Sequence, residues 1–218
     1  MLKDRLEFLG GPGGLRAAAY FGLKLIARLD TFHVVTIQPQ RSTSLILPSD
    51  WRYLSLYTGE MLSALPGDLV EQLSEQCGPN PEQLLGRGGS LHLLLSGDSL
   101  VAQLTIECGP GIQIDAPPLR LEMDEGDGFL SYLYTWPSYR RRSAAQRLIA
   151  AAVSDLSTRN VKRIIAHIRA TNVPSLAAFR NAGWKTEAMI VCTLSGRLLF
   201  APGAARARLS FGARTCGA

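Results

Sequence analysis

Residues 127–156 read DGFLSYLYTWPSYRRRSAAQRLIAAAVSDL and decide the fold of this chain. The part from 129 to 135 is rich in aromatic and apolar side chains, which favours a strand, and Pro137 ends it. From 139 to 156 apolar residues recur every three to four positions, which predicts an amphipathic helix. A strand followed directly by such a helix indicates an α/β protein.

The first two turns of this helix are strongly basic. They carry Arg140, Arg141, Arg142 and Arg147, and no acidic side chain precedes Asp155. A helix N-terminus is itself positive, so each cation there costs roughly 0.3–1 kcal/mol unless an anion is bound. Converging N–H groups and arginine side chains suit a phosphate group. The run therefore predicts a phosphate site, although a solvated basic turn or a nucleic-acid patch would also explain it.

The rest of the chain alternates between strand and helix patterns. Further strands are expected at 33–38, 90–95, 99–107, 163–168, 186–194 and 197–200, and further helices at 51–65, 66–77 and 175–182. The sequence Thr171-Asn172-Val173-Pro174 is typical of a helix start, and Gly183 is in the usual place for a helix end. The chain is therefore expected to alternate between strands and helices.

The composition is that of a globular protein. The chain has 218 residues, of which 46% are hydrophobic and 19% charged, with a net charge of +5, so one domain plus an extra element is expected. Its apolar runs are shorter than the ~20 residues that a spanning helix needs. The charged and glycine-rich start fits neither a signal peptide nor a transit peptide. A cytoplasmic location is the resulting expectation.

Cysteine and histidine give no sign of a metal site. The four cysteines, Cys77, Cys108, Cys192 and Cys216, form no CxxC pair, which favours free thiols. The histidines lie in apolar runs, which favours structural imidazoles over ligands; they are His33, His92 and His167.

The two ends of the chain differ from its middle. Residues 15–29 form an amphipathic pattern with a basic stripe, which predicts a helix that packs on its own domain or makes a weak contact with an anionic membrane or a partner. The end of the chain has arginine, alanine and glycine but no acid, which favours a frayed tail. We therefore expect a helical extension at 1–30, a domain at 31–203 and a flexible tail at 204–218.

Two motifs in this order resemble the GNAT superfamily of N-acyltransferases. Residues 140–145 match the family's Arg/Gln-x-x-Gly-x-Gly/Ala loop, and residues 170–184 match its A-x-N-x-x-S stretch with the later Gly-aromatic pair. The resemblance covers 127–185 closely and 33–200 in the order of strands. It implies an α/β fold of GNAT type, with a mixed, mostly antiparallel sheet of six or seven strands flanked by helices, plus an extra N-terminal amphipathic helix.

The resemblance also implies a co-substrate, acetyl-CoA or another acyl-CoA, and no metal. Its diphosphate would bind Arg140, Arg141, Arg142, Ser143, Ala144 and Ala145, and its pantetheine arm would contact Leu133, Tyr134, Thr135, Asn172 and Ser175. Helix capping explains Asn172 equally well.

This chain departs from the family at two positions. Ser143 replaces the first glycine of the loop, where its Cβ could crowd a phosphate or its hydroxyl could donate to one. Phe179 stands where many members have a tyrosine that protonates the departing thiolate. Candidates for the general base are Asp127 and Glu125, for which a solvated loop is the favoured alternative. Tyr134 is a candidate for the acid or for a wall of the acceptor site, with simple packing as the alternative.

These residues predict transfer of an acetyl or other short acyl group from coenzyme A to a primary amine, by direct attack in a ternary complex. The acidic cluster at 122–127 favours a cationic acceptor. The alternative is a non-catalytic acyl-CoA-binding or partner-binding module on the same fold. Nucleic-acid binding is not expected, because aromatic residues are not interleaved with the arginines, and a homodimer is left open.

Overall fold

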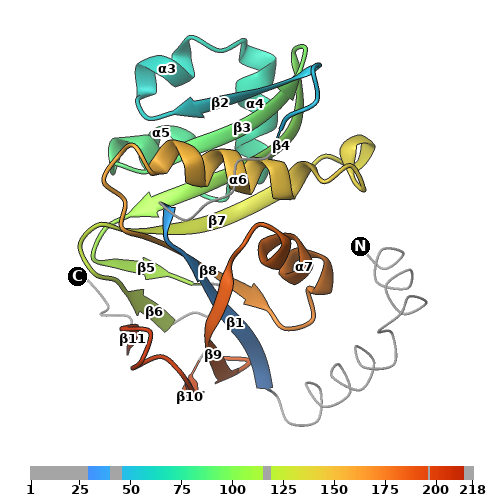
Figure 1. Cartoon of the computed structure of the whole chain (residues 1–218). Coiled ribbons are helices and arrows are strands. Elements are labelled where there is room, and N and C mark those ends of the chain that lie inside the picture. Colours follow the sequence, from blue (N-terminus) through green and yellow to red (C-terminus); the bar gives the residue numbers. More distant parts are fainter. Residues whose placement is uncertain (1–28, 40–45, 115–118, 196, 214–218) are drawn as a thin grey trace.

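The computed structural model describes residues 29–39, 46–114, 119–195 and 197–213, and an eight-stranded sheet forms its centre (Figure 1). The order of strands is β10-β9-β1-β8-β7-β4-β3-β2. They are β1 (Leu29–Ile37), β2 (Trp51–Leu56), β3 (Ser90–Ser96), β4 (Ser99–Cys108), β7 (Asp127–Thr135), β8 (Arg163–Arg169), β9 (Lys185–Thr193) and β10 (Leu198–Phe200). A smaller sheet of order β11-β6-β5 contains β5 (Gly111–Gln113), β6 (Leu119–Glu122) and β11 (Ser210–Ala213).

Helices cover both faces of the large sheet. They are α3 (Gly59–Ser63), α4 (Gly67–Gln76), α5 (Pro81–Gly86), α6 (Ala144–Leu156) and α7 (Val173–Asn181), with a short 3-10 helix, η2 (Pro137–Tyr139). Because strand side chains alternate between faces, Leu130 and Ala166 join a first core under α6 and α7, whereas Phe129 and Ile165 point to the opposite face. There they form a second core with the small sheet, and α3, α4 and α5 build a third core.

The pairing of β7 with β8 is parallel, unlike the other pairings of the large sheet. This pairing joins Asp127–Leu130 of β7 to Arg163–Ala166 of β8, and beyond these residues the two strands part. On its other edge β7 has a bulge, where the register against β4 shifts between Gln103 and Thr105 and Tyr132 takes φ +47°. A bulge bends a strand, so it helps to turn the end of β7 away from β8.

The strand expected near residues 33–38 occupies an internal position in the sheet. This strand, β1, pairs antiparallel with β8 on one side and β9 on the other. The earliest described strand thus separates two strands that follow one another along the chain. Its apolar residues explain why it forms a strand. No pattern in its own sequence indicates which strands it pairs with.

Residues 51–56 form strand β2 and not part of the helix expected at 51–65. They pair with β3 from Trp51 opposite Ser96 to Leu56 opposite Leu91, and both end residues of β2 are buried. Helix starts at Gly59, where the Thr58 side chain accepts a hydrogen bond from the Met61 amide. Tertiary pairing therefore decided the structure of a segment whose spacing also suited a helix.

The expected flexible tail packs onto the domain as far as the structure describes it. Ala204, Ala207 and Leu209 are buried in the second core, and β11 pairs with β6 along residues 210–213. Burial of small apolar side chains explains why this segment is not frayed. The helix expected at 15–29 lies outside the described residues, apart from Leu29 at the start of β1.

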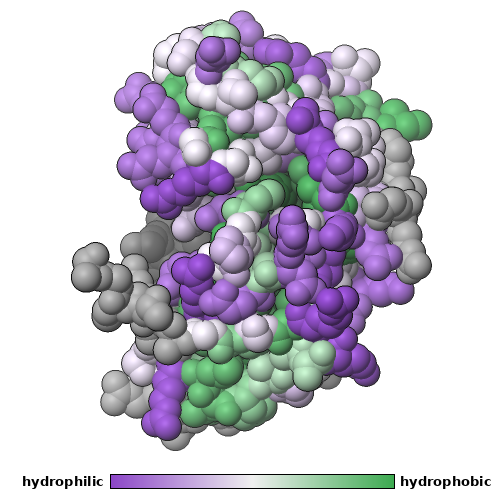
Figure 2. All heavy atoms as spheres, turned by 90° about the vertical axis from the view of Figure 1, so that its left-hand side faces the viewer, coloured by the Kyte–Doolittle hydropathy of each residue, from purple (hydrophilic) through white to green (hydrophobic). Residues whose placement is uncertain are grey.

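Most of the face seen in Figure 2 is hydrophilic, and apolar side chains gather at its lower end, at the height where Figure 1 places β10. Leu199 and Phe200 of that edge strand are 46% and 54% exposed. Among the described residues, no helix combines the length and the apolar character needed to cross a membrane.

Candidate active site

A cavity of about 350 Å³ lies where β7 and β8 part. Its lining includes Leu133, Ile168 and Phe179 from the α6/α7 side of the sheet. It also includes Phe129 and His167, whose stacked rings belong to the opposite side. The cavity therefore passes through the sheet, and two reactants could meet in it from opposite faces.

Next to the end of β7, the chain forms a turn that exposes the first amides of α6. Arg141 and Ser143 have φ +64° and +57°, a left-handed backbone that can turn successive N–H groups to one side. Within the described residues, the Ser143 side chain makes no capping hydrogen bond, and the first helical amide to find a carbonyl is that of Arg147, bound to Ser143. The amides of residues 144–146 are thus available to an anion.

The arginines of this turn are exposed, and Arg140 and Arg142 lie near aromatic rings. The Arg140 guanidinium is 6.0 Å from the ring centre of Tyr134, and its Nε donates to the Thr135 carbonyl at 3.3 Å. Arg142 lies 5.9 Å from the ring of Tyr139. The predicted loop therefore combines available amides with positive charge, and its residues fit a diphosphate group.

Ser143 holds a backbone conformation that glycine adopts without strain. A left-handed backbone costs other residues roughly 1–2 kcal/mol, and at a positive φ glycine carries no such cost. We expect Ser143→Gly to raise the free energy of unfolding by about 1 kcal/mol in urea titrations. Ser143→Ala is the matched control, because it removes the hydroxyl but keeps the strain. A Ser143→Gly variant less stable than the Ser143→Ala variant would contradict this explanation.

Helix α7 begins beside the same cavity. Asn172 is its N-cap, and the side-chain oxygen of Asn172 accepts a hydrogen bond from the Ser175 amide at 3.2 Å, which confirms the capping interpretation. Both residues also line the cavity, together with the buried Phe179, whose ring lies edge-on to Trp184. The wall at 179 is therefore apolar and supplies no proton.

On the opposite side, three polar residues form a hydrogen-bonded chain at the cavity. The Ser131 hydroxyl donates to Glu107 Oε1 at 3.1 Å and lies 2.8 Å from the hydroxyl of Thr105. Glu107 and Ser131 line the cavity. Sequence reasoning placed Glu107 only at the end of a strand. The alternation of Thr105 and Glu107 with apolar residues shows that the two side chains share one face of their strand. It does not show that a cavity lies on that face.

Aromatic rings form a wall next to this chain. His167 was predicted to be structural, and it does stack on Phe129, with centroids 5.5 Å apart, and lies 5.4 Å from Phe32. It also lines the cavity, which its sequence context did not indicate. Arg169 continues the row, with its guanidinium 5.3 Å from the Phe32 ring.

The bulge in β7 decides which tyrosine reaches the cavity. Tyr132 lines it, and its ring packs on Gly78 so closely that a Cβ at this glycine would be 2.0 Å from a ring atom. The predicted Tyr134 instead lies edge-on to Trp136, with centroids 5.0 Å apart, and is not among the cavity residues. Of the predicted strand contacts, Leu133 lines the cavity and Thr135 follows it on β7.

The structure does not bring the predicted bases, Asp127 and Glu125, to this cavity. Asp127 is buried at the start of β7, where both its oxygens bind Arg163 and one accepts from the Asp124 amide at 3.2 Å. Ser131 lies four positions further along the strand, which is about 13 Å. Glu125 lies in the preceding turn and lines a different cavity of about 430 Å³. Asp127 is therefore buried and bound to an arginine at the start of β7.

The thiols of the described residues are free, as expected, at Cys77, Cys108 and Cys192. Burial raises the pKa of Cys77 to about 12, and the charge of Glu107 adds to this rise. The pKa of Cys108 is also raised, again mainly by burial. Cys77 and Cys108 are therefore protonated near neutral pH and are poor nucleophiles.

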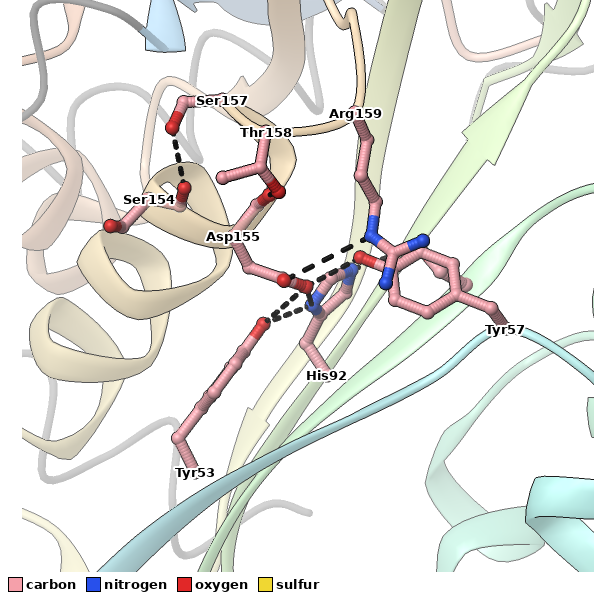
Figure 3. Close-up of polar contacts among 9 residues, drawn as sticks. Tyr53, Tyr57, His92, Ser154, Asp155, Ser157, Thr158 and Arg159 are labelled. Atoms are coloured by element: carbon pink, nitrogen blue, oxygen red, sulfur yellow. Dashed lines mark hydrogen bonds and ion pairs between the residues drawn. The ribbon is translucent and has the colours of Figure 1, made fainter.

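A polar cluster around the buried His92 holds the far end of α6, away from the cavity (Figure 3). The carboxylate of Asp155 accepts hydrogen bonds from Tyr57 at 2.5 Å and from Tyr53 at 3.2 Å. The Tyr53 hydroxyl also lies 2.5 Å from His92 Nδ1, and Arg159 stacks over the Tyr57 ring at 3.5 Å. The cluster ties α6 to β2 and β3, and so steadies the helix whose other end carries the available amides.

His92 makes this cluster sensitive to acid. Burial lowers its pKa from 6.5 to about 4, despite the opposing charge of Asp155. The unfolded chain therefore takes up a proton before the folded protein does, so stability is lost as pH falls from about 6.5 to about 4. We expect a loss of up to about 3 kcal/mol over this range, measured by urea unfolding. In the His92→Gln variant this part of the pH dependence should disappear, and an unchanged pH profile would contradict the assignment.

Comparisons with known proteins agree with this architecture. The model of the Acetyltransferase (GNAT) family matches residues 68–184. A solved acetyltransferase of the GNAT family from Novosphingobium aromaticivorans has 18% identity and a TM-score of 0.51, over 86% of this chain and 66% of that one. An N-acetyltransferase from Sphaerobacter thermophilus has 14% identity and a TM-score of 0.51, over 81% and 56%.

A tandem GNAT protein from the clavulanic acid biosynthesis pathway is similar at 9% identity and a TM-score of 0.51, over 84% of this chain and 59% of that one. This chain thus spans between 56% and 66% of the length of these three structures. No curated protein matches it. At such low identities the solved structures bear on the fold alone.

Proposed function

Because the chain belongs to the GNAT acetyltransferase family, we propose that it transfers an acetyl or other short acyl group from coenzyme A to a primary amine by direct attack. The observation that carries this proposal is the cavity through the sheet. It has the α7 residues Asn172 and Ser175 on one side and Glu107 with Ser131 on the other. A donor and an acceptor can therefore reach the same point, one from each face of the sheet. Direct transfer requires the two reactants to be held together in this way.

The donor side is built from backbone groups. The amides at the start of α6 would hold the diphosphate, with Arg140, Arg141 and Arg142 adding charge and Ser143, Ala144 and Ala145 forming the turn and first helical residues. Beyond Leu130 the edge of β7 is no longer paired with β8, so the arm could add to Leu133, Tyr134 and Thr135 as a further strand. An acyl-CoA bound in this way supplies the thioester carbonyl.

On the acceptor side, Glu107 is the candidate general base. Its carboxylate lies at the cavity and is held by the Ser131 hydroxyl, so it can take a proton from an ammonium group directly or through a water molecule. No acid is assigned on the donor side, where Phe179 occupies the tyrosine position. The thiolate of a thiol with a pKa of about 8.5 is a good leaving group and needs little help from an acid.

Two measurements test the proposal. Acetyl-CoA at about a hundred times its dissociation constant should raise the melting temperature by roughly 5 °C or more, by mass action. Thiol release should then depend on an added primary amine. An unchanged melting temperature at saturating acetyl-CoA would remove the co-substrate assignment. Binding without thiol release for a broad panel of amines would instead indicate the non-catalytic module.

A further inference from the structure

We propose that Ser131 is a catalytic residue that passes the proton of the acceptor amine on to Glu107. This inference rests on the proposed function and adds a second residue to its acid–base chemistry. The Ser131 hydroxyl donates to Glu107 Oε1 at 3.1 Å, and both residues line the cavity. A hydroxyl can accept a proton from nitrogen while it gives up its own, so it can connect an amine to a base that the amine does not touch.

The register of the strands places Ser131 at the point where β7 and β8 part. Glu107 is opposite Phe129, which is level with Ile165 of β8, so the two strands are still paired at this height. Ser131 directly follows Leu130, the last residue of β7 that pairs with β8. Because side chains alternate along a strand, Ser131 is also the first residue beyond this point that faces the acceptor side.

A nitrogen at this point meets Ser131 before it meets Glu107. The backbone of Glu107 lies two residues further back, about 6.6 Å along the sheet from the level of Ser131. Its carboxylate reaches forward to the Ser131 hydroxyl, at 3.1 Å. The hydroxyl therefore lies between the carboxylate and the part of β7 to which the donor arm would add.

Thr105 fixes the direction of this relay. It is fully buried and lies directly opposite Ser131, and the two hydroxyl oxygens are 2.8 Å apart. A hydroxyl has one proton and two lone pairs, so a Ser131 that donates to Glu107 must accept from Thr105. Within the described residues, this leaves one lone pair of the Ser131 oxygen for an N–H of the acceptor. The acceptor cannot reach Thr105 itself, because that side chain is buried.

The proton transfer balances in atoms and charge. An N–H bond of the ammonium group breaks and an O–H bond forms at Ser131 Oγ. At the same time the original O–H bond of Ser131 breaks, and its proton binds Glu107 Oε1. The amine is then neutral, and its lone pair can attack the thioester carbonyl. Ser131 ends with one proton, as it began, so no free alkoxide forms.

The test removes the hydroxyl and measures the rate over a range of pH. The acceptor is the primary amine that gives the fastest thiol release among those assayed for the proposed function, with saturating acetyl-CoA. Below the pKa of that amine, we expect Ser131→Ala to lower kcat/KM for the amine by about 10²-fold or more. The loss should shrink at higher pH, because the amine then arrives neutral. An equal loss at every pH would indicate a structural role and overturn the proposal.

Two further variants guard against a change in the fold. Ser131→Thr keeps the hydroxyl and should restore kcat/KM to within about tenfold of the original. Ser131→Cys has nearly the size of serine, but a thiol is a weak donor and acceptor, so its loss should approach that of Ser131→Ala. Ser74→Ala is the matched control. It removes an exposed hydroxyl of α4 that donates to the Val70 carbonyl, and it should keep the original rate.

The outcomes separate this inference from the proposed function. A Ser131→Ala variant with the original rate would overturn the relay and leave the acyltransferase function with Glu107 as its base. Equal rates for Ser131→Thr and Ser131→Ala would also overturn the relay. Absence of amine-dependent thiol release by the original protein would remove the proposed function itself, and the relay with it. In each variant the rise in melting temperature with acetyl-CoA should match the original, which shows that the donor side is intact.

Discussion

Replacement of Glu107 by glutamine should lower kcat for acyl transfer by about 10²- to 10⁴-fold, the usual contribution of a general base. Glutamine keeps the size of the side chain and can still accept the hydrogen bond of Ser131, but it cannot take up the amine proton. The cavity and the anion site at α6 should be unchanged. The rate is measured as thiol release at saturating acetyl-CoA and amine.

Two further measurements make this result interpretable. Acetyl-CoA binding by the variant, followed by calorimetry, should match that of the original protein, because the amides of α6 do not contact Glu107. Glu60→Gln, at an exposed position of α3, is the matched control and should keep the original rate. A Glu107→Gln variant with the original kcat would exclude this residue as the base. If Glu125→Gln instead caused a large loss of kcat, the general base would be Glu125, in the loop before β7.

The second large effect concerns stability. Replacing Asp127 by asparagine should lower the free energy of unfolding by about 3–5 kcal/mol, because it removes the charge that compensates a largely buried arginine. The side chains of Asp127 and Arg163 are only 4% and 18% exposed, and the pair joins the starts of β7 and β8. Urea unfolding measures the change.

Asp124 provides the matched control for Asp127. It also lies near Arg163, at 3.9 Å, but its side chain is 49% exposed, and Asp124→Asn should cost less than about 1 kcal/mol. The two predictions together separate a structural carboxylate from a catalytic one. If Asp127→Asn lost activity but kept its stability, the placement of Asp127 as a structural residue would be wrong.

Local patterns predicted much of the fold. The strands at 90–96, 99–108 and 163–169 and the helix at 173–181 were expected within two residues at each end, because each has a clear period and a clear stop. Helix α6 begins five residues later than its pattern suggested, since residues 140–143 form the turn that exposes its amides. The error at 51–56 has another cause: an edge strand whose spacing suits either element takes the structure of its neighbour.

The two sides of the candidate site differed in how far they could be predicted. The donor side lies within two continuous segments, around Arg140 to Ala145 and around Asn172, and a cap or a loop is a local property. The acceptor side is assembled from separate strands. Glu107 comes from β4, Tyr132 from a bulge in β7, and Arg169 from β8 beside Asp30 of β1.

By itself, the sequence determined the family's two motifs, the helix with the cationic start and the alternation that gives each strand its faces. These depend on residues a few positions apart, so they can be read without knowing the fold. Only the tertiary structure decided which carboxylate faces the cavity and which is buried with an arginine. Alternation shows which side chains of one strand share a face, but the strand beside it, and the point where β7 leaves β8, follow from the packing of the whole sheet.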